Sequence, residues 1–173
     1  MKNSTTSSDI KTLVEVTKAD SRIKKAQLLP HPDSRLDSFL MKIHPISDEG
    51  VPYRDLTNLE TKKESLGQLI EKLNVTKSIR YQRTVEDTYC NVYSYDYCYF
   101  SKVYLPTIWW TDEALQRVLN GEEVEPIFGE TVDNIYSSAI HDWFGVWGAS
   151  FGWKKMTDLD EIQHKVNTEG GVG

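Results

Sequence analysis

Hydrophobic and polar positions follow a helical spacing most clearly between residues 57 and 74. Thr57 with Glu60 has the spacing of a capping box, in which two side chains satisfy the free amides at the start of a helix. The hydrophobic positions that follow form one helical stripe: Leu59, Leu66, Leu69, Ile70 and Leu73. The pattern predicts an amphipathic helix that ends at Asn74.

Two more helices are predicted further along the chain. The first begins with Thr111 as its cap and ends at Asn120 and Gly121, with acidic residues in its first turn. After an extended segment at 124–128, Thr131 opens the second helix, which ends at Gly148. Its apolar residues recur at intervals of four: Ile135, Ala139, Trp143 and Trp147.

The last predicted helix begins with a second capping box, Thr157 with Asp160, and carries Leu159, Ile162 and Val166. Beyond it, the glycine-rich run at 170–173 is typical of a turn before a strand. After the first helix, residues 75–88 are predicted to form an exposed or semi-ordered connection.

The segment Tyr89 to Phe100, YCNVYSYDYCYF, fits two structures. Tyrosines alternate from Tyr93 to Tyr99, and this period of two favours a strand. A buried helix with an aromatic coat is the alternative, and the periodicity alone does not decide between them. The choice matters because a helix that begins here would place Cys90 at its positive end.

Four prolines among charged residues break any long helix before residue 57. We therefore divide the chain into an irregular lead, 1–56, and a helix-rich domain, 57–173. Within the lead, residues 1–8 are predicted to be an arm without regular structure and Leu36 to Ile43 a short strand. The overall fold class is predicted to be α+β.

Charge excludes one class of partner. The net charge is -6, and the basic residues are scattered instead of forming a stripe, so nucleic acid is not expected as a partner. No run reaches the roughly 20 apolar residues of a membrane span, and the first twenty residues lack the apolar core of a signal peptide. We expect a protein that is cytoplasmic when synthesised and is exported, if at all, without a classical signal peptide.

Two cysteines, Cys90 and Cys98, are the candidate nucleophiles, and their spacing suits neither a disulfide framework nor a metal site. We expect both to be free thiols, with Cys98 as a small buried residue. The start of a helix lowers the pKa of a thiol, so Cys90 is the better candidate if the helical reading is right. No metal and no cofactor are expected.

The chain resembles the nucleophile segment of bacterial papain-like amidases and endopeptidases of the NlpC/P60 and CHAP groups. The resemblance begins at Leu66 and rests on LIEKLNV at 69–75, the pairs Arg80-Tyr81 and Tyr95-Asp96, the T-Y-C-N run at 88–91, and Leu105-Pro106 before Trp109; it continues more loosely to Trp153.

This resemblance implies the helix-rich N-terminal part of a papain-like fold, with Cys90 as nucleophile and with Asn91 and Asp96 as local support for the helix start and its packing. It further implies a peptidoglycan or peptide substrate. Members of these groups include toxins delivered into rival bacteria, for which an inhibitor or immunity protein is a further partner.

The general base is left open between two readings. In the resembled enzymes a catalytic histidine lies on a strand well after the nucleophile helix, and the printed sequence has no such segment. His141, beside Asp142, is one candidate, although neighbouring residues on a helix point apart. The other candidate is a residue beyond Gly173. His31, His44 and His164 are expected to be surface residues.

Five tryptophans could line a sugar-binding groove: Trp109, Trp110, Trp143, Trp147 and Trp153. Helical spacing makes Trp143 and Trp147 better candidates for the core, which leaves the adjacent pair Trp109-Trp110 as the groove candidate, grouped with Asn91 for substrate binding. Taken with the residues that carry it, the resemblance implies a cysteine hydrolase that cleaves an amide bond in cell-wall peptides. The alternative is a binding module for a protein or glycan that keeps a hydrolase-like scaffold without catalysis.

Overall fold

The computed structural model describes residues 20–34, 39–47, 50–85 and 87–172. Its elements in chain order are α2 (Phe39–Lys42), α3 (Leu59–Leu73), the 3-10 turn η1 (Ile79–Tyr81), α4 (Cys90–Phe100), β1 (Ile108–Trp110), α5 (Asp112–Leu119), β2 (Val132–Asn134), α6 (Ser137–Val146), the 3-10 turn η2 (Gly148–Phe151) and α7 (Leu159–Glu169). Helices with a small antiparallel sheet make an α+β fold, as expected.

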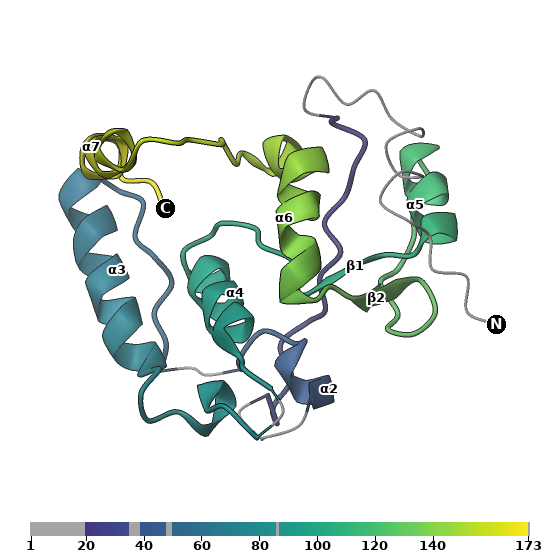
Figure 1. Ribbon diagram of the computed structural model, residues 1–173, viewed down its shortest axis with the longest axis horizontal. Helices are drawn as coiled ribbons and strands as arrows, with labels where there is room; N and C mark the ends of the chain where they lie inside the picture. Colours follow the sequence, from purple (N-terminus) through teal and green to yellow (C-terminus); the bar gives the residue numbers. More distant parts are fainter. Residues whose placement is uncertain (1–19, 35–38, 48–49, 86, 173) are drawn as a thin grey trace.

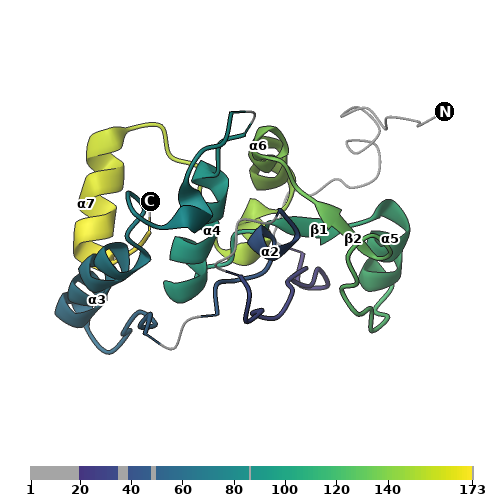
Figure 2. The same ribbon diagram turned by 90° about the horizontal axis from the view of Figure 1, so that it is seen from below.

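Helix α4 lies in the middle of the molecule (Figures 1 and 2). Helices α3 and α7 lie on one side of it, and α6, the β1–β2 ribbon and α5 follow on the other. Within the part of the chain that the structure describes, no helix is both long and apolar enough to cross a membrane.

The two strands pair antiparallel, with Ile108 opposite Asn134 and Trp110 opposite Val132. Side chains of a strand point alternately to its two faces. Ile108 and Trp110 therefore share one face, and Trp109 lies on the other. Both faces are covered, because Trp109 packs against Trp143 of α6 while the Trp110 indole nitrogen donates to the carbonyl oxygen of Lys24 at 2.9 Å.

Buried side chains form two hydrophobic clusters, one around the ribbon, α5 and α6, the other between α3 and α4. The described part of the irregular lead contributes to both. Ile23 and Ile43 belong to the first cluster, and Ile46 and Val51 to the second. The lead thus folds against the helical part of the chain although most of it has no regular structure.

Helix α3 confirms the first prediction in its extent, but its cap is a different residue. Asn58 accepts a hydrogen bond from the Thr61 amide at 3.0 Å, and the Thr61 hydroxyl accepts one from the Asn58 amide at 3.1 Å. Thr57 instead donates its hydroxyl to Asp55 at 2.6 Å. Helix α7 is shifted in the same way, because Asp158 caps it and not Thr157.

Helix α6 begins six residues later than the predicted start at Thr131. Residues 132–134 form β2, because pairing with β1 satisfies their backbone. The Thr131 hydroxyl belongs to a turn, where it accepts from the Ile127 amide at 2.8 Å and donates to the Glu125 carbonyl oxygen at 2.6 Å. Helix α5, by contrast, has the predicted Thr111 cap, whose side chain accepts from the Ala114 amide.

Two predictions about irregular segments are wrong. The expected strand at Leu36 to Ile43 is replaced by α2 over 39–42, while residues 35–38, like the predicted arm at 1–8, lie outside the described residues. The glycine-rich run also differs, since Gly170 ends α7 in the left-handed conformation at φ 70° and its amide donates to Val166. Glycine is favoured there because an L side chain is strained at this φ, and an added Cβ would also lie 3.2 Å from Cδ1 of Leu59.

Candidate functional site

The tyrosine-rich segment is a helix, α4, and this settles the choice that its sequence left open. Residues four apart in sequence are neighbours on a helix surface, so the alternating tyrosines form two separate pairs. Tyr93 and Tyr97 stack with ring centroids 6.3 Å apart, and Tyr95 and Tyr99 lie 6.4 Å apart on another side. Cys90 is the first residue of the helix and its side chain is exposed.

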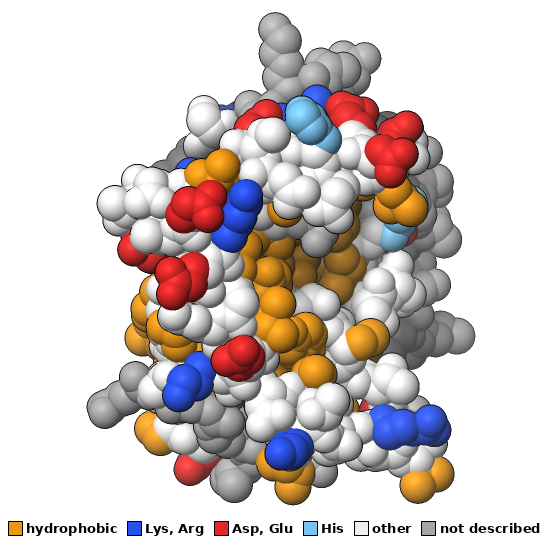
Figure 3. Space-filling view, turned by 90° about the vertical axis from the view of Figure 1, so that its left-hand side faces the viewer, with side chains coloured by type: hydrophobic (Ala, Val, Ile, Leu, Met, Phe, Trp, Pro, Cys, Tyr) orange, Lys and Arg blue, Asp and Glu red, His pale blue; other side chains and the backbone are white. Residues whose placement is uncertain are grey.

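An apolar groove of about 580 Å³ lies against α4. Seen from the side of α3 and α7, the molecule has a hollow lined mainly by hydrophobic side chains (Figure 3). The groove is lined by Ile70, Cys90, Asn91, Tyr93, Ser94, Tyr97, Cys98, Leu105, Ser137, Ile140, Phe144, Trp153 and Val172. No charged side chain of the described residues belongs to this lining.

A second, more polar pocket of about 520 Å³ lies at the start of α4. It is lined by Lys42, Ile43, Asp87, Thr88, Tyr89, Asn91, Val92, Thr107, Asn134, Tyr136 and Ser137. Asn91 and Ser137 belong to both linings, so the apolar groove and the polar pocket adjoin at these two side chains. Cys90 lies next to this boundary, on the side of the groove.

Lys42 supplies the positive charge of the polar pocket. Its side chain is 2% exposed, and its Nζ lies 3.2 Å from the centroid of the Tyr89 ring. An ammonium over an aromatic face is attracted by the negative charge of the ring. This contact holds the head of Lys42 against the residue that precedes Cys90.

Both cysteines are free thiols, as expected, and both line the apolar groove. They differ in exposure. Burial raises the pKa of the Cys98 thiol to about 12, so Cys98 is a neutral, inert wall residue near neutral pH. Cys90 is the accessible thiol of the pair.

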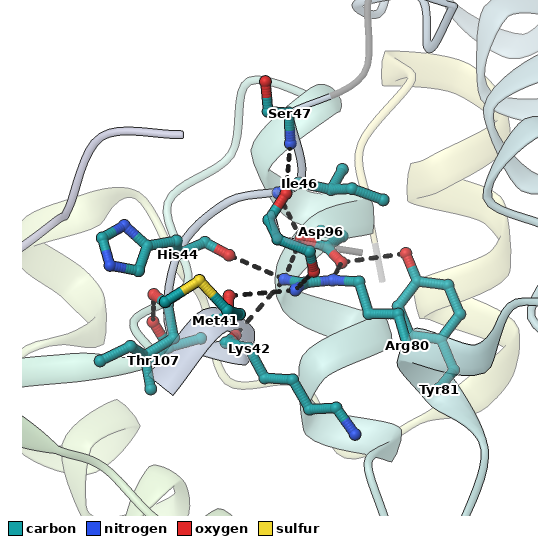
Figure 4. A network of polar contacts seen from close by, with 11 residues as sticks. Met41, Lys42, His44, Ile46, Ser47, Arg80, Tyr81, Asp96 and Thr107 are labelled. Carbon is teal, nitrogen blue, oxygen red and sulfur yellow. Dashed lines mark hydrogen bonds and ion pairs between the residues drawn. The ribbon is translucent and has the colours of Figure 1, made fainter. Parts of the chain in front are cut away.

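A buried ion pair fixes α4 to the rest of the molecule (Figure 4). The Arg80 Nε donates to the Asp96 carboxylate at 2.6 Å, and both side chains are 0% exposed. The Tyr81 hydroxyl donates to the same carboxylate at 2.9 Å, and the Ile46 amide donates to it at 3.3 Å. Burial raises the pKa of the Asp96 carboxyl, and the positive charge of Arg80 opposes that rise.

Arg80 also donates hydrogen bonds to the backbone of the lead, including that of α2. It donates to the carbonyl oxygens of Met41 at 3.2 Å, Lys42 at 3.3 Å and His44 at 2.7 Å, and to that of Ser34. The sequence analysis placed Arg80 and Tyr81 in an exposed connection, which is wrong, because both are buried. Asp96, expected to support the helix start and its packing, anchors the middle of α4 through these contacts. Two charged residues, sixteen positions apart, gave no local signal of this pairing.

His141 lies on α6 beside the apolar groove but does not line it. Positions three and four apart are neighbours on a helix, so His141 lies between Ser137 and Phe144 on the helix surface. Its side chain is 89% exposed, and its Nδ1 lies 3.4 Å from the carboxylate of Asp142. Of the other histidines, His164 is exposed, whereas His31 and His44 are half-buried with ring centroids 5.4 Å apart.

The predicted substrate-binding residues separate in the structure. Asn91 lies beside Cys90, at the boundary between the apolar groove and the polar pocket. Trp109 and Trp110 line neither, because each faces a covered side of β1, and Trp110 is buried in the first hydrophobic cluster. A sugar-stacking surface does not form there. Trp153, from the same aromatic set, does line the groove.

Within the described ranges, no group of three or more His, Cys, Asp or Glu side chains is placed to hold a metal ion. Comparison of the chain with protein-family models, with curated proteins and with solved structures gives no match.

Proposed function

We propose that this chain carries the nucleophile of a papain-like cysteine hydrolase that cleaves an amide bond in bacterial cell-wall peptides. The observation that carries the proposal is the position of Cys90. It is the first residue of α4, its thiol is exposed, and it lies in the wall of an apolar groove next to a polar pocket. A nucleophile needs this combination of access and a shaped cavity beside it.

The start of α4 also suits the chemistry. The first amides of a helix have no partner within it, and no side chain of the Tyr89 cap accepts from them. The amides of Cys90 and Asn91 are therefore available to donate to the oxyanion that forms when a thiolate attacks a carbonyl.

The proposed reaction has two steps. The Cys90 sulfur bonds to the carbonyl carbon, the carbon–nitrogen bond breaks, and the amine leaves with a proton from the general acid, which leaves a thioester on Cys90. Water then attacks the thioester and gives the carboxylic acid and the free thiol. His141, on the helix that forms one side of the groove, is the candidate for the proton transfers among the described residues.

The resemblance of the T-Y-C-N run and its neighbours to NlpC/P60 and CHAP enzymes supports the same reaction class. Helix α4 is consistent with it, since that run opens a helix in those enzymes. A cell-wall substrate and a role as a delivered toxin come from the resemblance alone.

The test is the release of soluble peptides from purified peptidoglycan, measured by liquid chromatography with mass detection. We expect cleavage by the wild-type chain, none by Cys90→Ala, and unchanged cleavage by Cys98→Ala as the matched control. A His141→Gln variant tests whether His141 is the general base, in which case cleavage should be lost. Equal product release by wild type and Cys90→Ala would contradict the proposal.

One observation favours a second candidate, a binding module without catalysis. No histidine or carboxylate of the described residues lines the apolar groove, so the Cys90 thiol has no base within that wall. The two candidates differ in thiol reactivity. At pH 6.5 a catalytic Cys90 should react with iodoacetamide at least about tenfold faster than glutathione does, whereas a binding module should show an equal or lower rate and release no peptides.

A further inference from the structure

The apolar groove has its polar side chains at one end. Asn91, in the first turn of α4, and Ser137, the first residue of α6, line both the groove and the adjoining polar pocket, and Cys90 lies beside them. Ser94 follows one turn along α4, where its hydroxyl donates to the Cys90 carbonyl oxygen at 3.0 Å. The end of the groove beside the thiol is therefore the end that suits a polar group.

The other end of the groove is apolar. Phe144 lies about two turns along α6, and its ring centroid is 5.0 Å from that of Trp153. The Trp153 indole nitrogen donates to the carbonyl oxygen of Tyr104, the neighbour of Leu105, at 2.7 Å. These contacts place three of the lining residues together at this end: Leu105, Phe144 and Trp153.

Helix α4 sets the distance between the two ends. Cys90 and Cys98 both line the groove, and eight residues of helix correspond to about 12 Å along the axis. The Val103 amide donates to the Cys98 carbonyl oxygen at 2.9 Å, so the chain that leads to Leu105 starts beside Cys98. The groove is thus long enough for an extended chain that starts at Cys90 and follows α4.

Charge restricts what this chain can be. No charged side chain of the described residues lines the groove. A charged group placed at the apolar end would lose its hydration without gaining a counter-ion, which is costly. An apolar chain would instead remove the aromatic and aliphatic walls from water, which favours binding. The occupant that fits is uncharged and apolar along its length, with a polar group only beside Cys90.

We propose that the groove is the acyl subsite of Cys90, and that it takes an uncharged acyl chain of about decanoyl length whose carbonyl group lies at the first turn of α4. As a statement about substrate, this inference rests on the hydrolase proposal, because it names the acyl side of the bond that Cys90 attacks. As a statement about binding, it does not require catalytic turnover.

Acyl thioesters of N-acetylcysteamine test the subsite directly. The Cys90 thiolate attacks the thioester carbonyl carbon, a new carbon–sulfur bond forms, the old one breaks, and N-acetylcysteamine leaves as a thiolate that takes a proton from water. Three donors are compared: the decanoyl thioester, the acetyl thioester, and the monothioester of decanedioic acid, which adds a carboxylate at the far end of an equally long chain. Mass spectrometry of the intact protein at pH 8 gives the rates, and peptide mapping locates the acyl group.

Each rate is divided by the rate of the same donor with glutathione, which removes differences in intrinsic reactivity. We expect the normalised decanoyl rate at Cys90 to be about tenfold or more above the other two, because several buried methylene groups contribute at least that factor. Equal normalised rates for decanoyl and acetyl donors would overturn the inference. Equal rates for the decanoyl and decanedioic donors would overturn it as well, because the apolar end would then accept a charge.

One substitution places the chain in the groove. Ile70 lines the groove from α3 and is 48% exposed, so Ile70→Gln should leave the fold intact and reduce the decanoyl preference by about fivefold. The matched control is Ile79→Gln, because Ile79 is 59% exposed and lines neither the groove nor the polar pocket. Equal preference in wild type and Ile70→Gln would overturn the placement of the chain.

A second copy of the chain is the competing occupant of the groove, and sedimentation velocity separates the two. A dimer that Ile70→Gln converts to a monomer, together with no decanoyl preference, would overturn the inference. The outcome for the hydrolase proposal is distinct. Peptide release that depends on Cys90, without the decanoyl preference, refutes the inference alone, whereas the preference without any peptide release refutes the hydrolase alone.

Discussion

Replacing Asp96 with asparagine should remove about 3–5 kcal/mol from the free energy of unfolding, because it leaves the Arg80 charge buried without its counter-ion. In the native protein the carboxylate accepts from Arg80 Nε at 2.6 Å and from Arg80 Nη2 at 3.1 Å. Each hydrogen bond that involves a charged group contributes about 1.5–3 kcal/mol. Two such bonds account for the expected loss, which is a large part of the 5–15 kcal/mol typical of a domain.

The assay is urea unfolding followed by tryptophan fluorescence at pH 7. Glu122→Gln is the matched control, since it removes one carboxylate from an exposed pair with Arg117 at 2.9 Å and should cost less than about 1 kcal/mol. Tyr81→Phe, which deletes one hydrogen bond to Asp96, should cost about 1 kcal/mol.

A loss below about 1 kcal/mol for Asp96→Asn would refute the reasoning. Burial raises the pKa of the Asp96 carboxyl, and a carboxyl that were neutral at pH 7 would resemble asparagine and tolerate the change. A small loss would therefore mean that Arg80 is held by the backbone carbonyl oxygens and not by an ion pair.

Three further outcomes follow from the helix ends and the buried thiol. Asn58→Ala should lower the unfolding free energy by about 1 kcal/mol in urea titrations, because it removes the α3 cap; no change would place the cap elsewhere. Gly170→Ala should cost about 1–2 kcal/mol in the same assay, because of its φ of 70° and the close contact with Lys62. At pH 8 only about one Cys98 thiol in ten thousand is ionised in the native state, given a pKa raised to about 12, so iodoacetamide should modify Cys90 and leave Cys98 intact by peptide mass mapping. Since the folded-state pKa of Cys98 lies above the usual 9.0, the stability from burying the neutral thiol is full below pH 9 and is lost as pH rises toward 12.

Local signals in the sequence were sufficient to predict some of the helices. Helices α3, α5 and α7 were predicted because each combines an apolar stripe with a capping residue at its start. The exact cap was missed twice, at Asn58 and Asp158, because an adjacent threonine offered a similar spacing to an acidic residue.

The other elements depend on partners distant in sequence. Strand β2 displaced the first residues of a predicted helix because β1 pairs with it across more than twenty residues. Segment 90–100 became a helix although its tyrosines alternate, because Val92, Asp96 and Phe100, four apart, share a buried face. Nothing within β2 identifies its partner strand, and nothing within segment 90–100 shows that the charged Asp96 is one of its buried positions.

The candidate site was predicted in part. Cys90 and Asn91 were named from a short run of residues, and the structure places both beside the groove. Lys42 was missed, because a lysine in an irregular lead gives no sign that it will be buried against Tyr89. Its position depends on the carbonyl oxygens of α2 that Arg80 binds, which is a tertiary effect.

The attachment of α7 has a consequence for motion. None of its residues is buried, and its end is held to the rest of the chain by Gly170, whose carbonyl oxygen accepts from Arg54 and whose Cα packs near Leu59. An element with so little buried surface exchanges its amide hydrogens through local opening instead of global unfolding. Val172, just beyond it, forms part of the groove wall, so each such opening would also displace that part of the wall.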